Sequence, residues 1–372
     1  MRRAFGIVDF SPSRIRVRGL QDYRPIGAFS FLGRYRIIDF PISNMTNSEI
    51  EHIQVYVKRR PRSLVEHLGT GRHYNINSKS GRLRVLYAED GLDDNNIYNT
   101  DIGTFIANME CIEKENLPYV VIAPSYMIYA ENYDKLIQTH INSGADITLL
   151  YHTVDNADVA YPNCMYVNLN KQKGVLSIER NRGTAKNRNI FMDTYVMKKE
   201  LFIELVYKAH QTSSMYSLVD IVNASCNDYD VRAISHRGYF AAINDLKSYY
   251  DANLSLLDLK VSEQLFNDEW PIYTRTSDSQ PTKYLSDAAV KDSFVSNGCT
   301  IEGEIHHSII GRGCVIKKGA VVEDSVLLPG TLVGENAVVK GFVVDKGAQI
   351  VHENELNATP EDPGYVKRRD VL

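Results

Sequence analysis

The chain has 372 residues, long enough for two or three domains, and its 44% hydrophobic and 24% charged residues are typical of a soluble globular protein. With 42 Lys and Arg against 46 Asp and Glu, the net charge of −4 argues against nucleic-acid binding by the molecule as a whole. Five scattered cysteines without a CxxC pair, and the lack of an apolar run of about 18 residues, exclude a disulfide scaffold, a zinc site and a membrane span. We therefore expect a cytoplasmic protein with reduced thiols and no signal peptide.

Up to about residue 260, short apolar runs alternate with amphipathic stretches. The apolar runs predict strands, and the stretches between them predict helices. The expected strands are 53–57, 119–123 and 146–151, and the expected helices are 63–68 and 133–142. Such alternation favours βαβ units in a mostly parallel sheet, whose ligands lie beyond the carboxyl ends of the strands.

A change in composition marks the end of this first part. Residues 245–260 have helical spacing without a breaker, which predicts one further helix. Pro271, Pro281 and many small polar residues follow it. We therefore assign residues 1–260 to an α/β domain and residues 261–290 to a linker.

After residue 290, aliphatic residues recur about every six positions. The repeated residues are Ile310, Ile316, Val322, Leu328, Val333, Val339, Val344 and Ile350. This spacing, with small or polar residues between, predicts a left-handed parallel β-helix rather than the alternative, a small β-sandwich. Each triangular coil takes three hexapeptides, so residues 295–351 supply about three coils. We assign residues 291–372 to this domain and expect the charged tail after Glu353 to be loose.

Several segments match one known family in the same order along the chain. The sequence GRYRIIDFPISN at residues 33–44 closely resembles the GKYRIIDFxLSN motif of glucose-1-phosphate adenylyltransferases. RSLVEHL at 62–68, ANLSLL at 252–257 and WPI at 270–272 resemble later motifs of that family. The resemblance implies a nucleotidyltransferase-like (Rossmann-like) domain followed by a β-helix. It also implies the conversion of ATP and glucose 1-phosphate to ADP-glucose and pyrophosphate in glycogen biosynthesis.

The resemblance fails where the family binds nucleotide phosphates. Family members have a GGxGxRL loop, in which glycines allow backbone N–H groups to approach the phosphates. The corresponding residues 9–16, DFSPSRIR, contain no glycine, and Pro12 obstructs the phosphate path. The Lys of the family's KPAVPF stretch falls on Ile26.

The metal ligands of the family are also missing. Two aspartates are expected to hold Mg²⁺ in this family, and alignment of the motifs places Tyr126 and Ala242 at their positions. Neither residue supplies a carboxylate, and metal provides much of the charge neutralisation in phosphoryl-type transfer. Tyr216 replaces the Asp of a further motif, SHDFG. We therefore expect no catalytic residue and no metal in this chain, and expect Mg²⁺ in a catalytic partner.

Other family positions are retained. Tyr98 matches the Tyr of a WYRGTADA motif, and Glu179 with Arg180 partly matches FVEKP, so these three are candidate remnants of a substrate site. Arg24 and Arg36 align with basic effector-site positions of the family. Because a guanidinium binds phosphate bidentately, both are candidates for binding a sugar-phosphate or nucleotide effector. The alternative for this basic region is a solvated or intersubunit face.

A basic run at residues 58–62, KRRPR, follows the strand predicted at 53–57. Nucleic-acid-binding surfaces of this kind interleave aromatic side chains with the cations. The run contains none, and we assign it no nucleic-acid-binding role.

This combination of matches and losses resembles the non-catalytic, regulatory-type second subunit of some bacterial glycogen-synthesis systems. It implies a hetero-tetramer with a catalytic glucose-1-phosphate adenylyltransferase subunit whose activity or effector response this chain alters. Two alternatives stay open. One is an active sugar-1-phosphate nucleotidyltransferase with a remodelled metal site, and the other is a stand-alone sensor of sugar phosphates or nucleotides.

Overall fold

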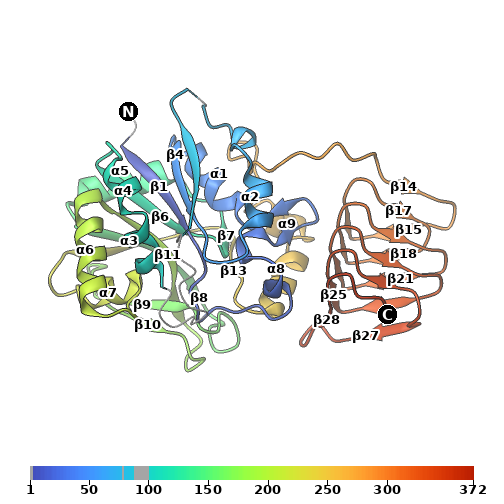
Figure 1. The fold of residues 1–372 in the computed structure, drawn as a ribbon. Helices are drawn as coiled ribbons and strands as arrows, with labels where there is room; N and C mark the ends of the chain where they lie inside the picture. Colours follow the sequence, from blue (N-terminus) through green and yellow to red (C-terminus); the bar gives the residue numbers. More distant parts are fainter. Residues whose placement is uncertain (1–2, 78, 88–99) are drawn as a thin grey trace.

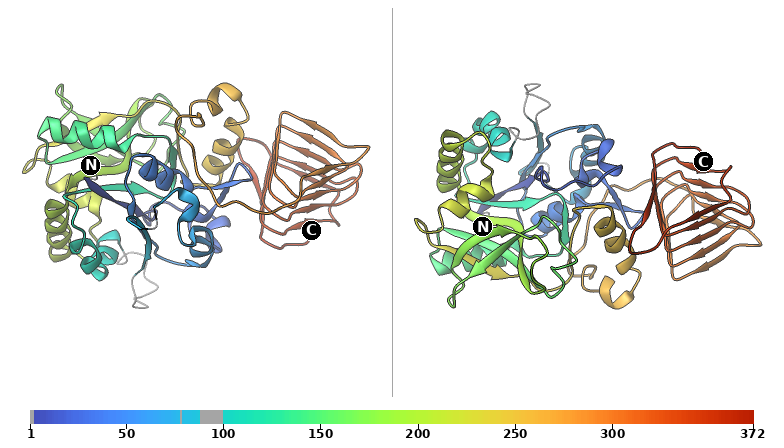
Figure 2. Two further views of the ribbon diagram at one scale, coloured as in Figure 1. Left: turned by 90° about the horizontal axis from the view of Figure 1, so that it is seen from above. Right: turned by 90° about the horizontal axis from the view of Figure 1, so that it is seen from below.

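A computed structural model describes residues 3–77, 79–87 and 100–372 of the protein. It has two parts that lie side by side (Figure 1, Figure 2). The first is an α/β domain built around one large sheet, and the second is a prism of short stacked strands formed by residues 283–372. None of the helices among the described residues is long and apolar enough to cross a membrane.

The main sheet has nine strands within the described residues. Seven of them run in the order β10-β9-β11-β6-β1-β4-β5, and β8 pairs with β11 on one side and β12 on the other. The strands are β1 (Ala4–Asp9), β4 (His52–Tyr56), β5 (Arg82–Leu86), β6 (Tyr119–Pro124), β8 (Ile147–Val154), β9 (Met165–Leu169), β10 (Val175–Arg180), β11 (Arg188–Lys198) and β12 (Val231–Ser235). The centre β6-β1-β4-β5 is parallel, whereas β11 is antiparallel to both β6 and β8.

Helices cover both faces of this sheet (Figure 1). They are α1 (Asp39–Asn47), α2 (Arg62–Leu68), α3 (Asp101–Ala107), α4 (Met109–Glu113), α5 (Tyr133–Ser143), α6 (Lys199–Thr212), α7 (Leu218–Ala224), α8 (Leu246–Ser255) and α9 (Leu259–Ser262). Side chains alternate along β1, so Phe5 and Ile7 join the core under α3, α4, α6 and α7. Ala4 and Val8 point the other way and join the core that includes α1, α2, α5 and α8.

The expected strands occur as β4, β6 and β8, and the expected helices as α2 and α5. The single helix predicted at 245–260 is wrong, because the chain leaves the helix after Ser255 and starts α9 at Leu259. Asp258 accepts a hydrogen bond from the backbone N–H of Lys260 (2.8 Å). A side-chain cap of this kind competes with continuation of the preceding helix.

The strand order places a topological switch point at β1. From β1 the chain moves to β4 and β5 on one side, and then returns to β6 on the other side of β1. Crossovers that leave in opposite directions open a crevice at the carboxyl ends of the strands. In this domain the crevice lies between the ends of β1 and β6, where the residues after Asp9 and Pro124 emerge.

Residues 283–372 form a left-handed β-helix rather than a β-sandwich. Three parallel sheets hold five strands each. The first sheet contains β14 (Lys283–Tyr284), β17 (Thr300–Ile301), β20 (Val315–Ile316), β23 (Leu332–Val333) and β26 (Gln349–Ile350). The second contains β15 (Ala289–Lys291), β18 (Glu304–His306), β21 (Val321–Glu323), β24 (Val338–Lys340) and β27 (Glu355–Asn357). The third contains β16 (Phe294–Val295), β19 (Ile309–Ile310), β22 (Val326–Leu327), β25 (Phe342–Val344) and β28 (Gly364–Val366). Ile301, Ile316, Val333 and Ile350 are in register and fully buried, which explains the aliphatic repeat.

At both of its ends, the β-helix extends further than the sequence analysis predicted. It has five coils instead of about three, and its first coil begins at Lys283, inside the segment expected to be a linker. The tail after Glu353 is not loose, because β27 and β28 complete the last coil and the backbone N–H of Leu372 donates to the carbonyl of Gln349 (2.9 Å). An end coil has a neighbour on one side only, so β14 and β15 stay exposed and lack the aliphatic signature.

Polar contacts join the β-helix to the α/β domain. The hydroxyl of Tyr250 on α8 donates to the backbone carbonyl of Asp324 (2.5 Å), and Arg24 forms a buried ion pair with Asp345. Gly33 has a positive φ of 66°, and a Cβ atom there would lie 2.3 Å from the hydroxyl of Ser296. The GRYR segment therefore needs a glycine at this position to approach the β-helix.

Candidate functional site

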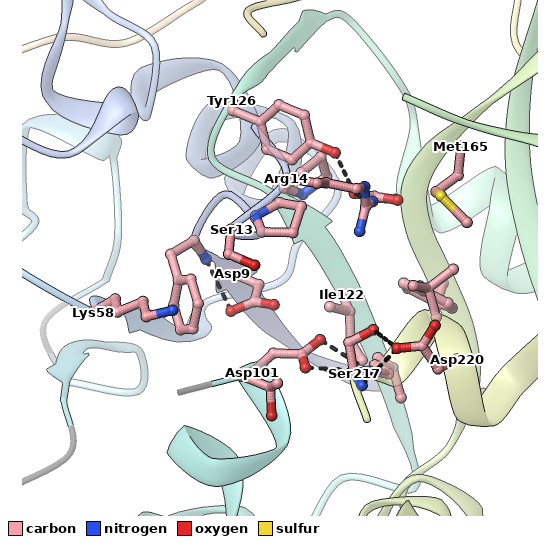
Figure 3. Close-up of a pocket in the computed structure, with 18 of the residues that line it drawn as sticks. Asp9, Ser13, Arg14, Lys58, Asp101, Ile122, Tyr126, Met165, Ser217 and Asp220 are labelled. Atoms are coloured by element: carbon pink, nitrogen blue, oxygen red, sulfur yellow. Dashed lines mark hydrogen bonds and ion pairs between the residues drawn. The ribbon is translucent and has the colours of Figure 1, made fainter. Parts of the chain in front are cut away.

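A cavity of about 420 Å³ lies at the carboxyl ends of β1 and β6, and we call it the switch-point cavity (Figure 3). Its walls come from the loop after β1, the start of α3, strands β6, β9 and β11, and the segment that leads into α7. Parallel sheets of this topology bind their ligands at this place. The switch-point cavity is therefore the position at which a nucleotidyltransferase-like domain is expected to hold its substrates.

Arg14 and Asp193 occupy this cavity and pair with each other. The Arg14 guanidinium lies 3.3 Å from a carboxylate oxygen of Asp193, and its Nε donates to the carbonyl of Asn163 (3.2 Å). Asp193 lies where the pairing of β11 with β8 shifts register, and its φ of 42° falls in the left-handed region, which aspartate tolerates better than most residues other than glycine. Burial alone would lower the pKa of Arg14, but the neighbouring Asp193 raises it above its ordinary value. The guanidinium is thus a fixed cation, already paired within the protein.

Tyr126 belongs to the same group. Its hydroxyl donates a hydrogen bond to the Asp193 carboxylate, and burial together with that carboxylate raises the tyrosine pKa well above its ordinary value. The phenol therefore stays protonated at neutral pH. Arg14 and Tyr126 point toward the same side of the cavity (Figure 3). Arg14 and Tyr126 thus both contact one carboxylate oxygen of Asp193, Oδ2, whereas its Oδ1 is buried without a hydrogen-bond partner among the described residues.

The two expected metal positions are brought together, but neither offers a metal ligand. Strand β7 (Met127–Tyr129) follows Tyr126 directly and pairs with β13 (Phe240–Ala242), with Met127 opposite Ala242. Mg²⁺ requires oxygen ligands, chiefly carboxylates and water. Ala242 has none, and the protonated Tyr126 already donates to Asp193. Among the described residues there is also no group of three or more His, Cys, Asp or Glu side chains that could hold a metal. The residues present do not fit Mg²⁺.

Three further carboxylates, those of Asp9, Asp101 and Asp220, line the cavity, and the sequence analysis did not identify them as site residues. Asp9 ends β1 and accepts a hydrogen bond from the N–H of Phe10 (2.8 Å), while Asp101 accepts from the N–H of Leu218 (3.0 Å). Burial and then the charge of Asp101 raise the pKa of Asp9 well above its ordinary value. Burial raises the pKa of Asp101 to about 6. A signal for Asp9 was available, because it stands at the end of the first apolar run of the chain.

The other expected site residues lie apart from this network. Ile26 is buried in a short 3-10 helix (Ile26–Ala28) and supplies no amine. Arg180 lines the switch-point cavity and donates its Nε to Asn163 (3.0 Å), whereas Glu179 is exposed and accepts from the hydroxyl of Tyr166 (2.7 Å). Tyr216 lies between the lining residues Met215 and Ser217 without lining the cavity itself.

Tyr98 lies outside the described residues. The glycine-free loop 9–16 forms the cavity wall through Pro12 and Ser13, and the N–H of Ile15 donates to the carbonyl of Pro12 (2.9 Å). A wall built from these side chains presents no row of backbone N–H groups to a phosphate.

A second pocket, of about 390 Å³, lies between the two domains, and we call it the junction pocket. Five of its lining residues are basic: Arg34, Arg36, Arg275, Arg312 and Lys346. The carboxylates in its lining are Glu66 and Asp278. The pKa of Lys346 is lowered to about 7, chiefly because the ammonium is buried and secondly because the positive charge of Arg36 is near. Burial also lowers the pKa of Arg36 itself. The pocket therefore concentrates positive charges that repel one another, and an anion would relieve that repulsion.

Arg24 and Arg36 have different surroundings. Arg36 lines the junction pocket and donates an Nη1 hydrogen to the carbonyl of Ala28 (2.5 Å). Arg24 does not line it; its guanidinium is 3% exposed and pairs with Asp345, the residue before Lys346. An anion on Lys346 would thus lie one residue away from the Arg24–Asp345 pair.

A buried carboxylate lies beneath this pocket. Asp39, in the RYRIIDF motif, accepts hydrogen bonds from His67 (2.6 Å), from the hydroxyl of Tyr74 (2.5 Å) and from the N–H of Arg36 (2.8 Å). Three of the roughly four acceptor sites of this carboxylate are thus directed to groups within the fold. Asp39 therefore positions the backbone of Arg36 and the ring of His67, which also lines the pocket.

Comparison with known proteins decides the family. Residues 15–258 match the nucleotidyl transferase domain, and residues 280–363 match the GlmU-like C-terminal hexapeptide domain. The chain belongs to the nucleotidyl transferase family. The second match covers almost the whole β-helix, so this family member carries its hexapeptide domain directly after the transferase domain.

Relatives at modest identity narrow the assignment. The glycogen biosynthesis protein GlgD of Geobacillus stearothermophilus is 30% identical over 322 residues, which cover 86% of this chain and 83% of the relative. GlgD of Bacillus subtilis (strain 168) is 25% identical over 363 residues, covering 98% and 95%. A glucose-1-phosphate adenylyltransferase of Bacillus thuringiensis (strain Al Hakam) is 27% identical over 341 residues, covering 90% and 89%. These relatives confirm the resemblance to glucose-1-phosphate adenylyltransferases and to proteins of glycogen biosynthesis.

Proposed function

We propose that the chain is a catalytically degenerate, regulatory subunit of a cytoplasmic glucose-1-phosphate adenylyltransferase in glycogen biosynthesis. It assembles with a catalytic homologue into a hetero-tetramer and alters that partner's activity or its response to an effector. The effector is a sugar phosphate or a nucleotide.

The proposal rests on the switch-point cavity, which lacks the expected metal carboxylates and in which the Arg14 guanidinium is already paired. Transfer of a nucleotidyl group depends on positioning and on neutralisation of phosphate charge, chiefly by metal. Tyr126 and Ala242 stand where the metal carboxylates are expected, and Asp193 already neutralises the Arg14 guanidinium. Asp9, Asp101 and Asp220 add further carboxyl groups to the same cavity. A triphosphate would meet carboxylates without a metal to compensate them.

The junction pocket supports an effector role. Arg34, Arg36, Arg275, Arg312 and Lys346 surround a space of about 390 Å³, enough for a phosphorylated sugar. Guanidinium groups bind phosphate bidentately, and five cations against two carboxylates leave an excess of positive charge. Because residues from both domains line the pocket, a bound anion favours one arrangement of the domains over others.

A subunit without activity changes its partner's catalysis only by binding the partner's conformational states unequally. Coupling free energies of about 1–3 kcal/mol are typical for such effects and correspond to several-fold changes in rate or affinity. Two surfaces are available for this role: the end coils of the β-helix, which leave strand edges unpaired, and the junction between the domains.

The proposal is tested with complexes that contain one disabled subunit. The chain is assembled with a catalytic homologue in which both metal-binding aspartates are replaced by asparagine, and ADP-glucose formation is measured. We expect no activity from this complex, and altered kinetics from a complex with the intact homologue. Turnover by the complex with the disabled homologue would show that this chain is itself a nucleotidyltransferase with a remodelled metal site.

The stand-alone sensor makes a different prediction, which size-exclusion chromatography with light scattering distinguishes. Under our proposal the chain and the intact homologue elute together with the mass of a tetramer. Separate elution, with kinetics of the homologue unchanged by the chain, would contradict the proposal and favour the sensor.

A further inference from the structure

One lysine of the junction pocket has an amine without a partner. Lys346 lies in the turn between β25 and β26 and lines the pocket. Its backbone is fixed, because its N–H donates to the Asp345 carboxylate (2.6 Å) and its carbonyl accepts from the N–H of Arg369 (3.1 Å). Among the residues that the structure describes, none forms a hydrogen bond or an ion pair with its Nζ atom. The amine therefore remains available to a molecule that enters the pocket.

Positive charges dominate the surroundings of this amine. The cations whose charges act on it are Arg36, Arg24 and Arg368. Asp345 acts against them, but its carboxylate already pairs with Arg24 and accepts a hydrogen bond from the hydroxyl of Tyr365 (2.9 Å). The other charged or titratable side chains of the pocket lining are Arg34, Tyr35, Glu66, His67, Arg275, Asp278 and Arg312. These surroundings disfavour an ammonium ion at Lys346.

The amine of Lys346 is consequently a nucleophile near neutral pH. Burial and the neighbouring cations lower its pKa from the ordinary value of 10.5 to about 7. About half of the amine is then unprotonated at pH 7, against roughly one part in a few thousand for an ordinary lysine. An unprotonated amine attacks electrophilic carbon, and burial beside other cations is one way in which proteins activate it.

Guanidinium donors without an acceptor lie near Lys346. The Nε atoms of Arg24 and Arg368 are buried, and neither has a hydrogen-bond partner among the described residues. The side chains of Arg34 and Arg312 likewise form no hydrogen bond or ion pair within the described ranges. Guanidinium groups pair well with planar anions that carry two oxygens. A carboxylate formed on Lys346 would thus meet cations that neutralise it.

We propose that Lys346 is a modification site, at which carbon dioxide adds to the side-chain amine and forms a carbamate. The lone pair of Nζ forms a bond to the carbon of CO₂, one electron pair of a C=O bond moves onto oxygen, and the nitrogen releases a proton to water. The reaction needs no oxidant, no metal and no second substrate. Its product carries a carboxylate at the end of the side chain, which the guanidinium of Arg36 and those of the pocket lining neutralise.

Carbamate formation changes the charge of the junction pocket. Five cations and two carboxylates line the pocket, and the modification converts them to four cations and three carboxylates. The pocket then attracts an external anion less strongly, so CO₂ and an anionic ligand compete for it. The modification itself does not depend on the regulatory role proposed above, because it needs only the amine and the surrounding cations.

The experiment looks for the carbamate on the isolated, full-length chain. The chain is equilibrated at pH 7 with isotopically labelled bicarbonate, which supplies dissolved CO₂. Triethyloxonium ion then ethylates the carbamate oxygen so that the group survives digestion, and mass spectrometry of the peptides locates the label. We expect an occupancy at Lys346 at least about tenfold higher than at Lys367. Lys367 is the internal control, because it is exposed, follows β28 and does not line the junction pocket.

A matched pair of variants gives a second readout, the carbon NMR resonance of the labelled carbamate. Lys346→Arg keeps a cation in the pocket but replaces the amine by a guanidinium, which stays protonated and does not add to CO₂. We expect this variant to lose a carbamate resonance that Lys367→Arg retains.

Sulfate separates this inference from the anion binding proposed for the same pocket. We expect sulfate to lower the occupancy at Lys346 several-fold, because a bound anion favours the charged ammonium. Labelling of Lys346 that sulfate leaves unchanged would still support the carbamate and would contradict anion binding in the pocket.

The proposal is overturned if no label is found at Lys346. Equal labelling of Lys346 and Lys367 would also overturn it, because that result indicates unspecific reaction of surface amines. An undiminished carbamate resonance in Lys346→Arg would place the modification elsewhere and contradict the proposal in the same way.

Discussion

Arg14 and Asp193, 179 residues apart in the sequence, meet in the switch-point cavity with 3.3 Å between guanidinium nitrogen and carboxylate oxygen. Both charges of this pair lie in the cavity where a nucleotidyltransferase-like domain is expected to hold its substrates. The hydroxyl of Tyr126 donates to the same carboxylate, so Asp193 pairs with two groups of the protein without a ligand. This network supports the proposal that the chain is catalytically degenerate.

The backbone at Asp193 gives a first prediction. A φ of 42° costs alanine about 1 kcal/mol or more, so glycine should be tolerated better than alanine here. Asp193→Ala and Asp193→Gly both leave Arg14 unpaired and should destabilise the fold by about 3 kcal/mol. We expect Asp193→Gly to be the more stable variant by about 1 kcal/mol in urea unfolding. Equal stability would contradict a backbone constraint at this position.

The raised pKa of Asp101 gives a second prediction. The carboxyl has an ordinary pKa of 3.8 and a pKa of about 6 in the folded protein, so its ionisation between these values costs folding stability. This contribution is present at low pH and lost as pH rises through about 6. Asp101→Asn keeps an oxygen that accepts from Leu218 but cannot ionise. Relative to wild type, we expect the variant to gain about 3 kcal/mol between about pH 4 and pH 7. A stability difference that is independent of pH would contradict this.

The third prediction concerns anion binding in the junction pocket. Lys346 has a pKa of about 7, and an anion binds better when its ammonium is charged. Sulfate keeps its charge in the neutral range, so we expect its affinity to fall about tenfold from about pH 6 to pH 8. Lys346→Met should bind sulfate more weakly and without this pH dependence. The same slope in wild type and variant would assign the titration to another group.

The fourth prediction is that Arg24 stabilises the fold through its ion pair with Asp345. Arg24 and Asp345 are 3% and 0% exposed, and removal of one partner leaves the other charge buried. We expect Arg24→Ala and Asp345→Ala to destabilise the protein by about 3–5 kcal/mol each. The double variant should be more stable than the sum of these losses predicts, by about 2 kcal/mol. Additive losses in chemical unfolding would show that the two residues do not depend on each other.

Sequence reasoning predicted the elements whose burial follows a regular spacing. The apolar runs gave β4, β6 and β8, and the aliphatic repeat gave the middle coils of the β-helix, because each repeated residue faces the interior. The end coils were missed, because they bury one face only. In the last coil, Leu356 and Val366 pack against the core at an irregular spacing, with two prolines between them.

The candidate site was predictable in part. Counting along motifs located Tyr126 and Ala242, and the β7–β13 pairing places these positions together. The Arg14–Asp193 pair was not predictable from spacing, because only the folded sheet brings the two residues together. An aspartate inside the apolar run IFMDTYVM at 190–197 was the one signal. Lys346 was missed because the β-helix pattern reports inward aliphatic residues and not the charges at its turns.

The central claim is that this chain regulates without catalysing, and one titration tests it most directly. A fixed amount of the catalytic homologue receives increasing amounts of the chain, and the initial rate of ADP-glucose formation is measured with ATP, glucose 1-phosphate and Mg²⁺. We predict no product from the chain alone, and a several-fold change in rate or substrate affinity that saturates at a fixed ratio of the two chains. Turnover by the chain alone at about 1 s⁻¹ or more, or a homologue rate that the chain never changes, would contradict the account.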